Sequence, residues 1–241
     1  MLTRGPFLRT VTLRDDHPVE AYPYGLPAIA DLDLAFGPVT MLVGDNGTGK
    51  STLTEAIAVA AGFNAEGGSR NLRFETTPTH SDLHRHLDLR WRQRPRWGWF
   101  LRAETFYGMA THVSRDGELA AGLPSLHDRS HGESFLDLID SRFDGVGLYV
   151  MDEPESALSF QGQLRLLRII RDRAREGSQF LIATHSPILM RAADATIYEF
   201  ADHGVRSVEF DDVVAVGLWR RFLDDPDPIL DVLYADDEDE R

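Results

Sequence analysis

The chain has 241 residues and a formal net charge of −14, from 39 acidic and 25 basic side chains. This excess of acid argues against a protein that coats nucleic acid or anionic membranes by bulk electrostatics, although a local basic patch stays compatible with it. The absence of cysteine excludes disulfides, thiolate catalysis and Cys-built metal centres. Together with an N-terminus unlike a signal peptide and no long apolar run, the composition predicts a cytoplasmic protein without a membrane span.

A glycine-rich loop follows the first clearly predicted strand. The strand is a short apolar run at residues 39–43, the loop spans 44–49, and an Ala-rich apolar stretch at 53–63 has the composition of a helix. This order predicts a strand, a tight loop and a helix.

Two further buried strands are predicted at residues 147–151 and 179–183, because both runs are short and continuously apolar. Residues 163–175, between them, have helical spacing. A strand, a helix and a strand in succession imply a parallel sheet, and therefore an α/β fold. The runs at 196–200 and 205–210 flank a turn and predict a hairpin at the sheet edge.

The domain organisation is predicted from shifts in composition. We expect a single domain whose core lobe comprises about 1–75 and 138–210. A smaller inserted lobe is expected at about 76–137, where the chain is rich in Gly, Arg and His and has weak periodicity. A C-terminal helix and an acidic tail are expected at about 211–241. From Asp224 onward the composition favours a solvated, partly disordered end, and without this tail the net charge is −6, since 30 acids then face 24 bases.

The loop and the start of the following helix match the phosphate-binding pattern G-x-x-x-x-G-K-[ST]. Glycines let backbone N–H groups turn toward phosphate oxygens, and the helix N-terminus adds its positive dipole end. Lys50, the only lysine among the 25 basic residues, would reach the β- and γ-phosphates, and Ser51 would hold Mg²⁺. The predicted nucleotide-binding residues here are Gly44, Asp45, Asn46, Gly47, Thr48, Gly49, Lys50, Ser51 and Thr52.

Two adjacent carboxylates, Asp152 and Glu153, follow the predicted strand at 147–151. In open α/β sheets, ligands bind at the carboxyl ends of the strands. Asp152 is therefore predicted to contact Mg²⁺ through its water shell. Glu153 is predicted to polarise the attacking water as a general base.

Three further segments, in their order along the chain, resemble the motifs of ABC-type ATPase domains. Residues 152–158 (DEPESAL) resemble the D-E-P-x-x-x-L stretch, and residues 183–187 (ATHSP) resemble the segment that carries the switch histidine, here His185. Residues 130–133 (SHGE) resemble the signature motif in the S-x-G-E form of the RecF, SMC and Rad50 branch, rather than the L-S-G-G-Q of transporters. The resemblance spans about 39–200 and leaves no room for the long coiled-coil arms of SMC or Rad50 proteins.

This resemblance implies a P-loop NTPase fold of the ABC type, with a mixed sheet core and helices on both faces. It also implies Mg²⁺-dependent ATP hydrolysis, with Lys50, Glu153 and His185 as catalytic residues. A head-to-tail homodimer would close on ATP, with each nucleotide held by one subunit's phosphate loop and capped by Ser130 and Gly132 of the other subunit. His185 would contact the γ-phosphate.

Two positions of the family pattern stay open in this sequence. A Gln that contacts Mg²⁺ and the attacking water usually follows the strand-like run that ends near Arg102, and none stands there. Glu104 takes its place as a metal ligand or has a structural role, and Gln93 is the other candidate. The aromatic residue that stacks on adenine could be Tyr22 or Tyr24.

The functional hypothesis is an ATPase that drives a DNA-repair or defence-related partner, either DNA or a nuclease-type protein. The Arg- and Trp-rich run at 85–102 could grip nucleic acid, but solvated strands with cation–π packing are the favoured interpretation. The alternative function is the ATP-binding subunit of an ABC transporter, and a small-molecule or nucleotide kinase is a further rival. A GTPase is disfavoured because no Asn-Lys-x-Asp motif occurs.

Overall fold

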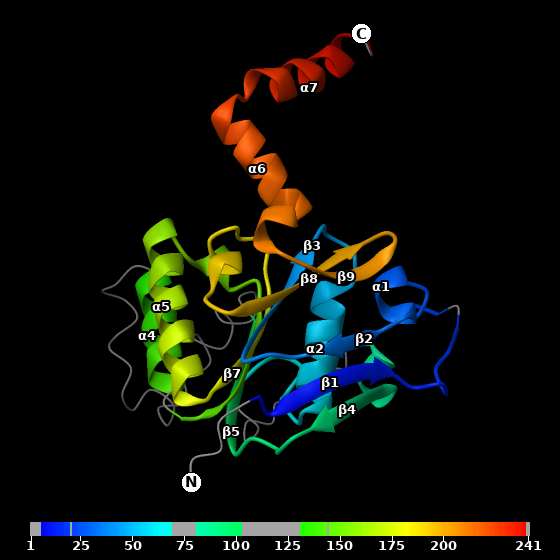
Figure 1. Cartoon of the computed structure of the whole chain (residues 1–241), viewed down its shortest axis with the longest axis vertical. Coiled ribbons are helices and arrows are strands. Elements are labelled where there is room, and N and C mark those ends of the chain that lie inside the picture. Colours follow the sequence, from blue (N-terminus) through cyan, green and yellow to red (C-terminus); the bar gives the residue numbers. More distant parts are fainter. Residues whose placement is uncertain (1–5, 20, 69–80, 103–130, 144, 240–241) are drawn as a thin grey trace.

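The computed structural model describes residues 6–19, 21–68, 81–102, 131–143 and 145–239. Within these ranges the strands form two sheets (Figure 1). The larger sheet has six strands in the order β5-β6-β7-β3-β8-β9, and the smaller sheet has three in the order β2-β1-β4. Among the described helices, none is long and apolar enough to cross a membrane.

The six-stranded sheet is parallel except at one edge, where β9 runs antiparallel to β8. Its strands are β3 (Val39–Gly44), β5 (Trp97–Arg102), β6 (Gly147–Asp152), β7 (Gln179–Ala183), β8 (Ala195–Ala201) and β9 (Gly204–Val208). The α/β fold, the three buried strands and the edge hairpin predicted from the sequence are confirmed. The central strands are buried on both faces, which explains their continuously apolar sequences.

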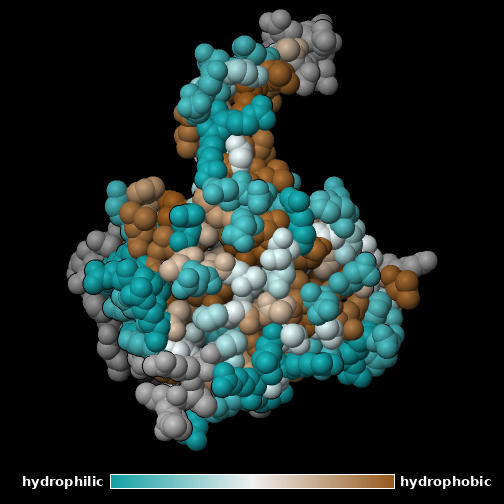
Figure 2. All heavy atoms as spheres, viewed as in Figure 1, coloured by the Kyte–Doolittle hydropathy of each residue, from teal (hydrophilic) through white to brown (hydrophobic). Residues whose placement is uncertain are grey.

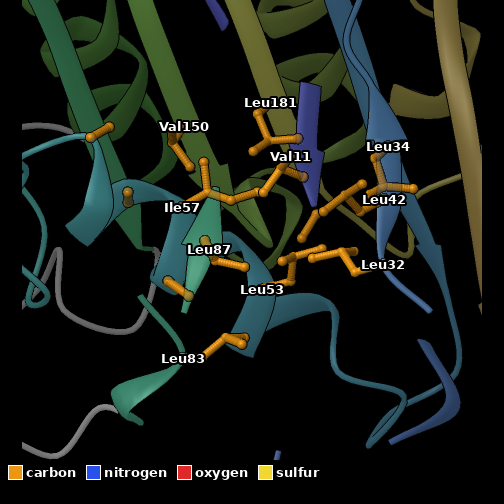
Figure 3. Close-up of a cluster of buried hydrophobic side chains, with 14 of the residues drawn as sticks. Val11, Leu32, Leu34, Leu42, Leu53, Ile57, Leu83, Leu87, Val150 and Leu181 are labelled. Carbon is orange, nitrogen blue, oxygen red and sulfur yellow. The ribbon is translucent and has the colours of Figure 1, made fainter. Parts of the chain in front are cut away.

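Two hydrophobic clusters cover the two faces of this sheet. On one face, α2 (Lys50–Ala60) inserts Leu53 and Ile57 between the two sheets, against residues such as Val11 (Figure 3). On the other face, α4 (His131–Arg142) and α5 (Phe160–Glu176) pack against the sheet, and Tyr149 stacks between Phe143 and Phe180. Burial of each such side chain stabilises the fold by about 1.5–3 kcal/mol.

The small antiparallel sheet was not predicted. It consists of β1 (Leu8–Leu13), β2 (Asp33–Ala35) and β4 (Leu87–Trp91). Two short helices complete this layer, α1 (Pro27–Ala30) and the 3₁₀ helix η1 (Asp82–Arg85). Residues of this sheet and of α2 belong to one hydrophobic cluster, so the small sheet closes the core on the α2 face of the large sheet.

The expected inserted lobe at about 76–137 differs from the structure in its described parts. β4 belongs to the small sheet, β5 forms an edge of the large sheet, and α4 packs on the large sheet's second face. Residues 81–102 are therefore part of the core, because β4 pairs with β1 and β5 pairs with β6, and both pairs join segments far apart in sequence. Residues 76–80 and 103–130 lie outside the described residues, so a separate lobe in that range stays a prediction.

The C-terminal part of the chain forms an arm that projects from the body (Figure 1). The arm consists of α6 (Val214–Asp224) and α7 (Asp227–Asp239), which follow the 3₁₀ helix η4 (Phe210–Asp212). The predicted C-terminal helix is present, and α7 occupies residues 227–239 of the expected acidic tail, whose partial disorder stays a prediction. Apolar residues at 229–234 supply a helical pattern that the acidic composition concealed.

Candidate functional site

The glycine loop connects β3 to α2 in a conformation that requires glycine. Gly44, Gly47 and Gly49 have φ values of 131°, 80° and 100°. A Cβ on Gly44 would collide with the backbone of Phe200, whereas a Cβ on Gly47 would meet none of the described atoms within 4 Å. The loop thus combines a closely packed base with an open tip.

The first turn of α2 is suited to an anion. It has no side-chain cap and no acidic residue, so its N-terminal N–H groups keep their positive dipole end uncompensated by a side chain. Ser51 and Thr52 lie in this turn, and the Thr52 hydroxyl is hydrogen-bonded to the hydroxyl of Tyr22 at 2.7 Å. These features fit the phosphate groups that the motif predicts.

Lys50 lies at the base of the loop and is only 4% exposed. Its Nζ donates hydrogen bonds to the carbonyl oxygens of Gly44 (2.9 Å) and Asp45 (2.6 Å). Burial lowers the pKa of Lys50, while the carboxylates of Glu153 and Asp152 act in the opposite direction. The ammonium group therefore lies within the electrostatic reach of both predicted catalytic-site acids.

The register of the large sheet brings three loops to one edge. Asp152 at the end of β6 pairs with Ala183 at the end of β7, and Ala183 pairs with Leu42 near the end of β3. The glycine loop, Glu153 and His185 therefore follow the carboxyl ends of three neighbouring strands. This is the edge at which open α/β sheets bind ligands.

Glu153 and His185 face each other at this edge. His185 Nε2 lies 3.6 Å from Glu153 Oε1. Glu153 has a left-handed backbone conformation, with φ 48° and ψ 51°, which is strained for a residue with a Cβ. Asp152, the preceding residue, stays buried at the end of the strand.

Asp152 has a basic neighbour that sequence reasoning missed. Arg102, the last residue of β5, lies with its Nε 3.8 Å from Asp152 Oδ2, and its Nη1 donates to Glu55 Oε2 of α2 at 2.7 Å. The register pairs Arg102 with Asp152 across adjacent parallel strands. No sequence signal connects Arg102 to Glu55, which lies 47 positions away.

The other predicted residues have mixed outcomes. Ser130 and Glu104 lie outside the described residues, and Gly132 lies in the first turn of α4, which begins at His131.

Gln93 is wrong as a site candidate, since it is exposed in the turn before β5 and thus at the opposite end of that strand from Arg102. Tyr24 is wrong as an adenine-stacking residue, because it is 2% exposed and its hydroxyl donates to Asp82. Both departures follow from packing that a short motif does not encode.

Two tryptophans of the Arg- and Trp-rich run contact guanidinium groups, and the third, Trp97, is 62% exposed. The guanidinium carbon of Arg94 lies 5.2 Å from the Trp91 ring centroid, and that of Arg142 lies 5.4 Å from the Trp99 ring centroid. Trp99 is buried in the core, so its ring is closed to a nucleic-acid base.

Comparisons with known proteins identify the family. The chain is 32% identical over 178 residues to the "Zinc import ATP-binding protein ZnuC" of Alkalilimnicola ehrlichii, a match that covers 69% of this chain and 66% of that relative. It is 29% identical over 171 residues to the "Cytochrome c biogenesis ATP-binding export protein CcmA" of Rhodopseudomonas palustris, covering 66% and 83%. The chain belongs to the ABC-type P-loop ATPases.

Two family models and one solved structure agree with this assignment. Residues 113–191 match a family described as "AAA domain, putative AbiEii toxin, Type IV TA system", and residues 25–87 match an "AAA domain" family. The fold of this ABC-type domain is similar to that of the "SMC head domain from Thermotoga maritima", with a TM-score of 0.52 and 19% identity over 85% of this chain and all of that chain. At this identity the likeness describes the fold.

Proposed function

We propose that this ABC-type domain hydrolyses ATP with Mg²⁺. The observation that carries the proposal is the convergence of the glycine loop, Asp152, Glu153 and His185 at the carboxyl ends of β3, β6 and β7. An anion-binding helix terminus, a buried lysine and paired carboxylates at one edge are the parts that phosphoryl transfer to water requires.

Each side chain has a role that its chemistry permits. The loop N–H groups from residues 44–49 and Lys50 bind and orient the phosphates, and Lys50 turns from its loop carbonyls toward them. Glu153 accepts a proton from the attacking water, and His185, whose Nε2 lies 3.6 Å from Glu153 Oε1, would contact the γ-phosphate. Ser51 and Asp152 offer hard oxygen ligands, which Mg²⁺ prefers. When bound, Mg²⁺ would neutralise charge on the β- and γ-phosphates.

We further propose that ATP closes a head-to-tail homodimer. Residues 45–47 of the phosphate loop are exposed, so a second surface is needed to exclude water from the γ-phosphate. Ser130 and Gly132 of the other subunit would supply this surface, with Gly132 in the first turn of α4 as support for a helix N-terminus there. Glu104 remains a candidate third metal ligand.

The proposed partner is DNA or a nuclease-type protein of a repair or defence system, in the RecF, SMC and Rad50 branch. The S-x-G-E form of residues 130–133, the SMC-head-like fold and the matched toxin–antitoxin family description support this choice. The names of the two curated relatives, a zinc importer and a cytochrome c export protein, favour the transporter alternative instead. A hydrolysis rate that rises with single- or double-stranded DNA would favour the DNA partner, since a transporter subunit has no reason to respond to DNA.

Glu153→Gln tests the catalytic proposal. The variant keeps the size of the side chain but lacks the basic carboxylate, so it should bind ATP, lose at least about 100-fold in turnover and accumulate as an ATP-bound dimer. Steady-state hydrolysis and light scattering with ATP measure both effects. Lys50→Ala is the control, because without the ammonium group it should lose ATP affinity and stay monomeric. A monomeric Glu153→Gln variant saturated with ATP would rule out the sandwich, and a fully active variant would rule out the base assignment.

A further inference from the structure

A carboxylate outside the predicted site residues holds the backbone of the switch loop, the segment 184–188 that carries His185 between β7 and η3. Glu155 lies in η2 (Pro154–Ala157), two residues after Glu153. Its Oε1 accepts hydrogen bonds from the backbone N–H of His185 at 2.5 Å and of Ser186 at 3.1 Å. Hydrogen bonds from N–H groups to a carboxylate are stronger than those between neutral groups. The loop that carries His185 is therefore tied to the turn that carries Glu153.

The rest of the switch loop is held by different side chains. The Ser186 hydroxyl donates to Gln163 of α5 and accepts from the N–H groups of Ile188 and Leu189. The Ser186 N–H also donates to the Thr184 hydroxyl. Only Glu155, among the described side chains, bonds the backbone of His185 itself. Loss of Gln163 and loss of Glu155 should therefore have different effects.

Two hydrogen bonds close the turn that contains Glu153 and Glu155. Ser156 donates twice to the Glu153 carbonyl oxygen, from its N–H at 3.1 Å and from its hydroxyl at 2.9 Å. Glu153 and the carboxylate of Glu155 thus belong to one closed unit. The two hydrogen bonds from the switch loop to Glu155 connect this turn to His185, whose Nε2 lies 3.6 Å from Glu153 Oε1.

We propose that Glu155 is a positioning residue that sets the place of His185 relative to Glu153 and the γ-phosphate. The inference rests on the proposed hydrolysis of ATP. It assigns Glu155 no contact with the nucleotide: the carboxylate acts through the His185 backbone. Because an error of about 1 Å in the placement of a catalytic group costs as much as 100-fold in rate, two hydrogen bonds to this backbone are enough to matter.

A double-mutant cycle with His185 tests the proposal on the full chain. Glu155→Ala removes the acceptor and should lower kcat about 10- to 100-fold, with KM and ATP affinity within about twofold of wild type. Glu155→Gln retains one carbonyl oxygen at the same place and should lose less. Because Glu155 acts through His185, the double variant with His185→Ala should be no slower than His185→Ala alone. If the loss of kcat in the double variant equals the product of the two single losses, Glu155 acts independently of His185 and the proposal is overturned.

Gln163→Ala is the matched control, since it loosens the same loop at Ser186 and should keep kcat within about threefold of wild type. An equal loss in both variants would overturn the proposal in favour of general loosening. A readout without catalysis is amide hydrogen exchange, which should accelerate at His185 and Ser186 in Glu155→Ala. Should Glu155→Ala fail to fold, Glu155→Gln carries the same cycle. A wild-type chain that does not hydrolyse ATP defeats the proposed function, whereas normal wild-type turnover with an unaffected Glu155→Ala defeats only the role of Glu155.

Discussion

At the residue scale, Gln179 connects the two sheets with one side chain. Its Oε1 accepts from the backbone N–H groups of Phe7 and Leu8, and its Nε2 donates to the carbonyl oxygens of Leu8 and Gly37. The side chain is 2% exposed, so none of these groups can turn to bulk water if it is removed.

Gln179→Ala should therefore destabilise the fold by at least about 2 kcal/mol, because it leaves buried backbone groups without partners. Urea unfolding, followed by circular dichroism, measures the free energy of unfolding. Gln161→Ala, on the exposed surface of α5, is the control and should change it by no more than about 0.5 kcal/mol. A Gln179→Ala variant as stable as this control would mean that water replaces the lost hydrogen bonds.

Residues with local patterns could be predicted from the sequence, and residues with distant partners could not. Lys50 and Asp152 belong to short motifs, and the structure brings them to one edge of the sheet. Gln179 bonds a residue 172 positions away, Arg102 one 47 away and Glu155 one 30 away. Each of these three depends on the register between strands or loops, which a single sequence does not display.

At the element scale, two glycines at helix positions have opposite roles. Gly177 ends α5 with φ 107°, a left-handed conformation that disfavours every residue with a Cβ. Gly217 lies inside α6, and a Cβ there would meet none of the described atoms within 4 Å.

Gly177→Ala should lower the free energy of unfolding by about 1–2 kcal/mol, because a left-handed backbone is strained for a residue with a Cβ. Gly217→Ala should raise it by about 0.5–1 kcal/mol, because Ala restricts the unfolded chain and favours helix. Urea unfolding of the two variants side by side is the measurement. The same sign in both would show that the backbone at one of these positions differs from the structure.

The strands that could be predicted from the sequence are those that are buried on both faces. β3, β6 and β7 are buried on both faces, so their apolar runs stand out. Only Leu8 and Val11 are buried in the six residues of β1, three positions apart, and β2 has three residues, so neither strand shows the alternation of a half-buried strand. β5 is apolar at 99–101 but lies in an arginine-rich context, which favoured its assignment to an inserted lobe.

At the scale of the whole molecule, the body and the arm differ in how they bury apolar surface. The base of α6 is locked to the body, since Val213 and Val216 are buried and the Val214 N–H donates to Glu199 at 2.7 Å. Beyond this base the arm exposes large apolar side chains over α6 and α7 (Figure 2). They are Leu218, Trp219, Phe222, Leu223, Val232, Leu233 and Tyr234. The stability of the fold therefore resides in the two clusters around the large sheet, next to the proposed ATP site.

Ligand binding at that site should stabilise the whole body, because the glycine loop, Asp152 and His185 all extend from strands of the same buried sheet. ATP with Mg²⁺ at about 100 times its Kd should add about 2.7 kcal/mol to the free energy of unfolding, provided that only the folded state binds. For a chain of this size the unfolding midpoint should then rise by about 5–10 °C. Differential scanning fluorimetry on Glu153→Gln, which preserves the nucleotide, measures the shift. Lys50→Ala should show no shift, and chelation of Mg²⁺ should reduce that of Glu153→Gln. An equal shift in Lys50→Ala would mean that ATP stabilises the protein from a site other than the glycine loop.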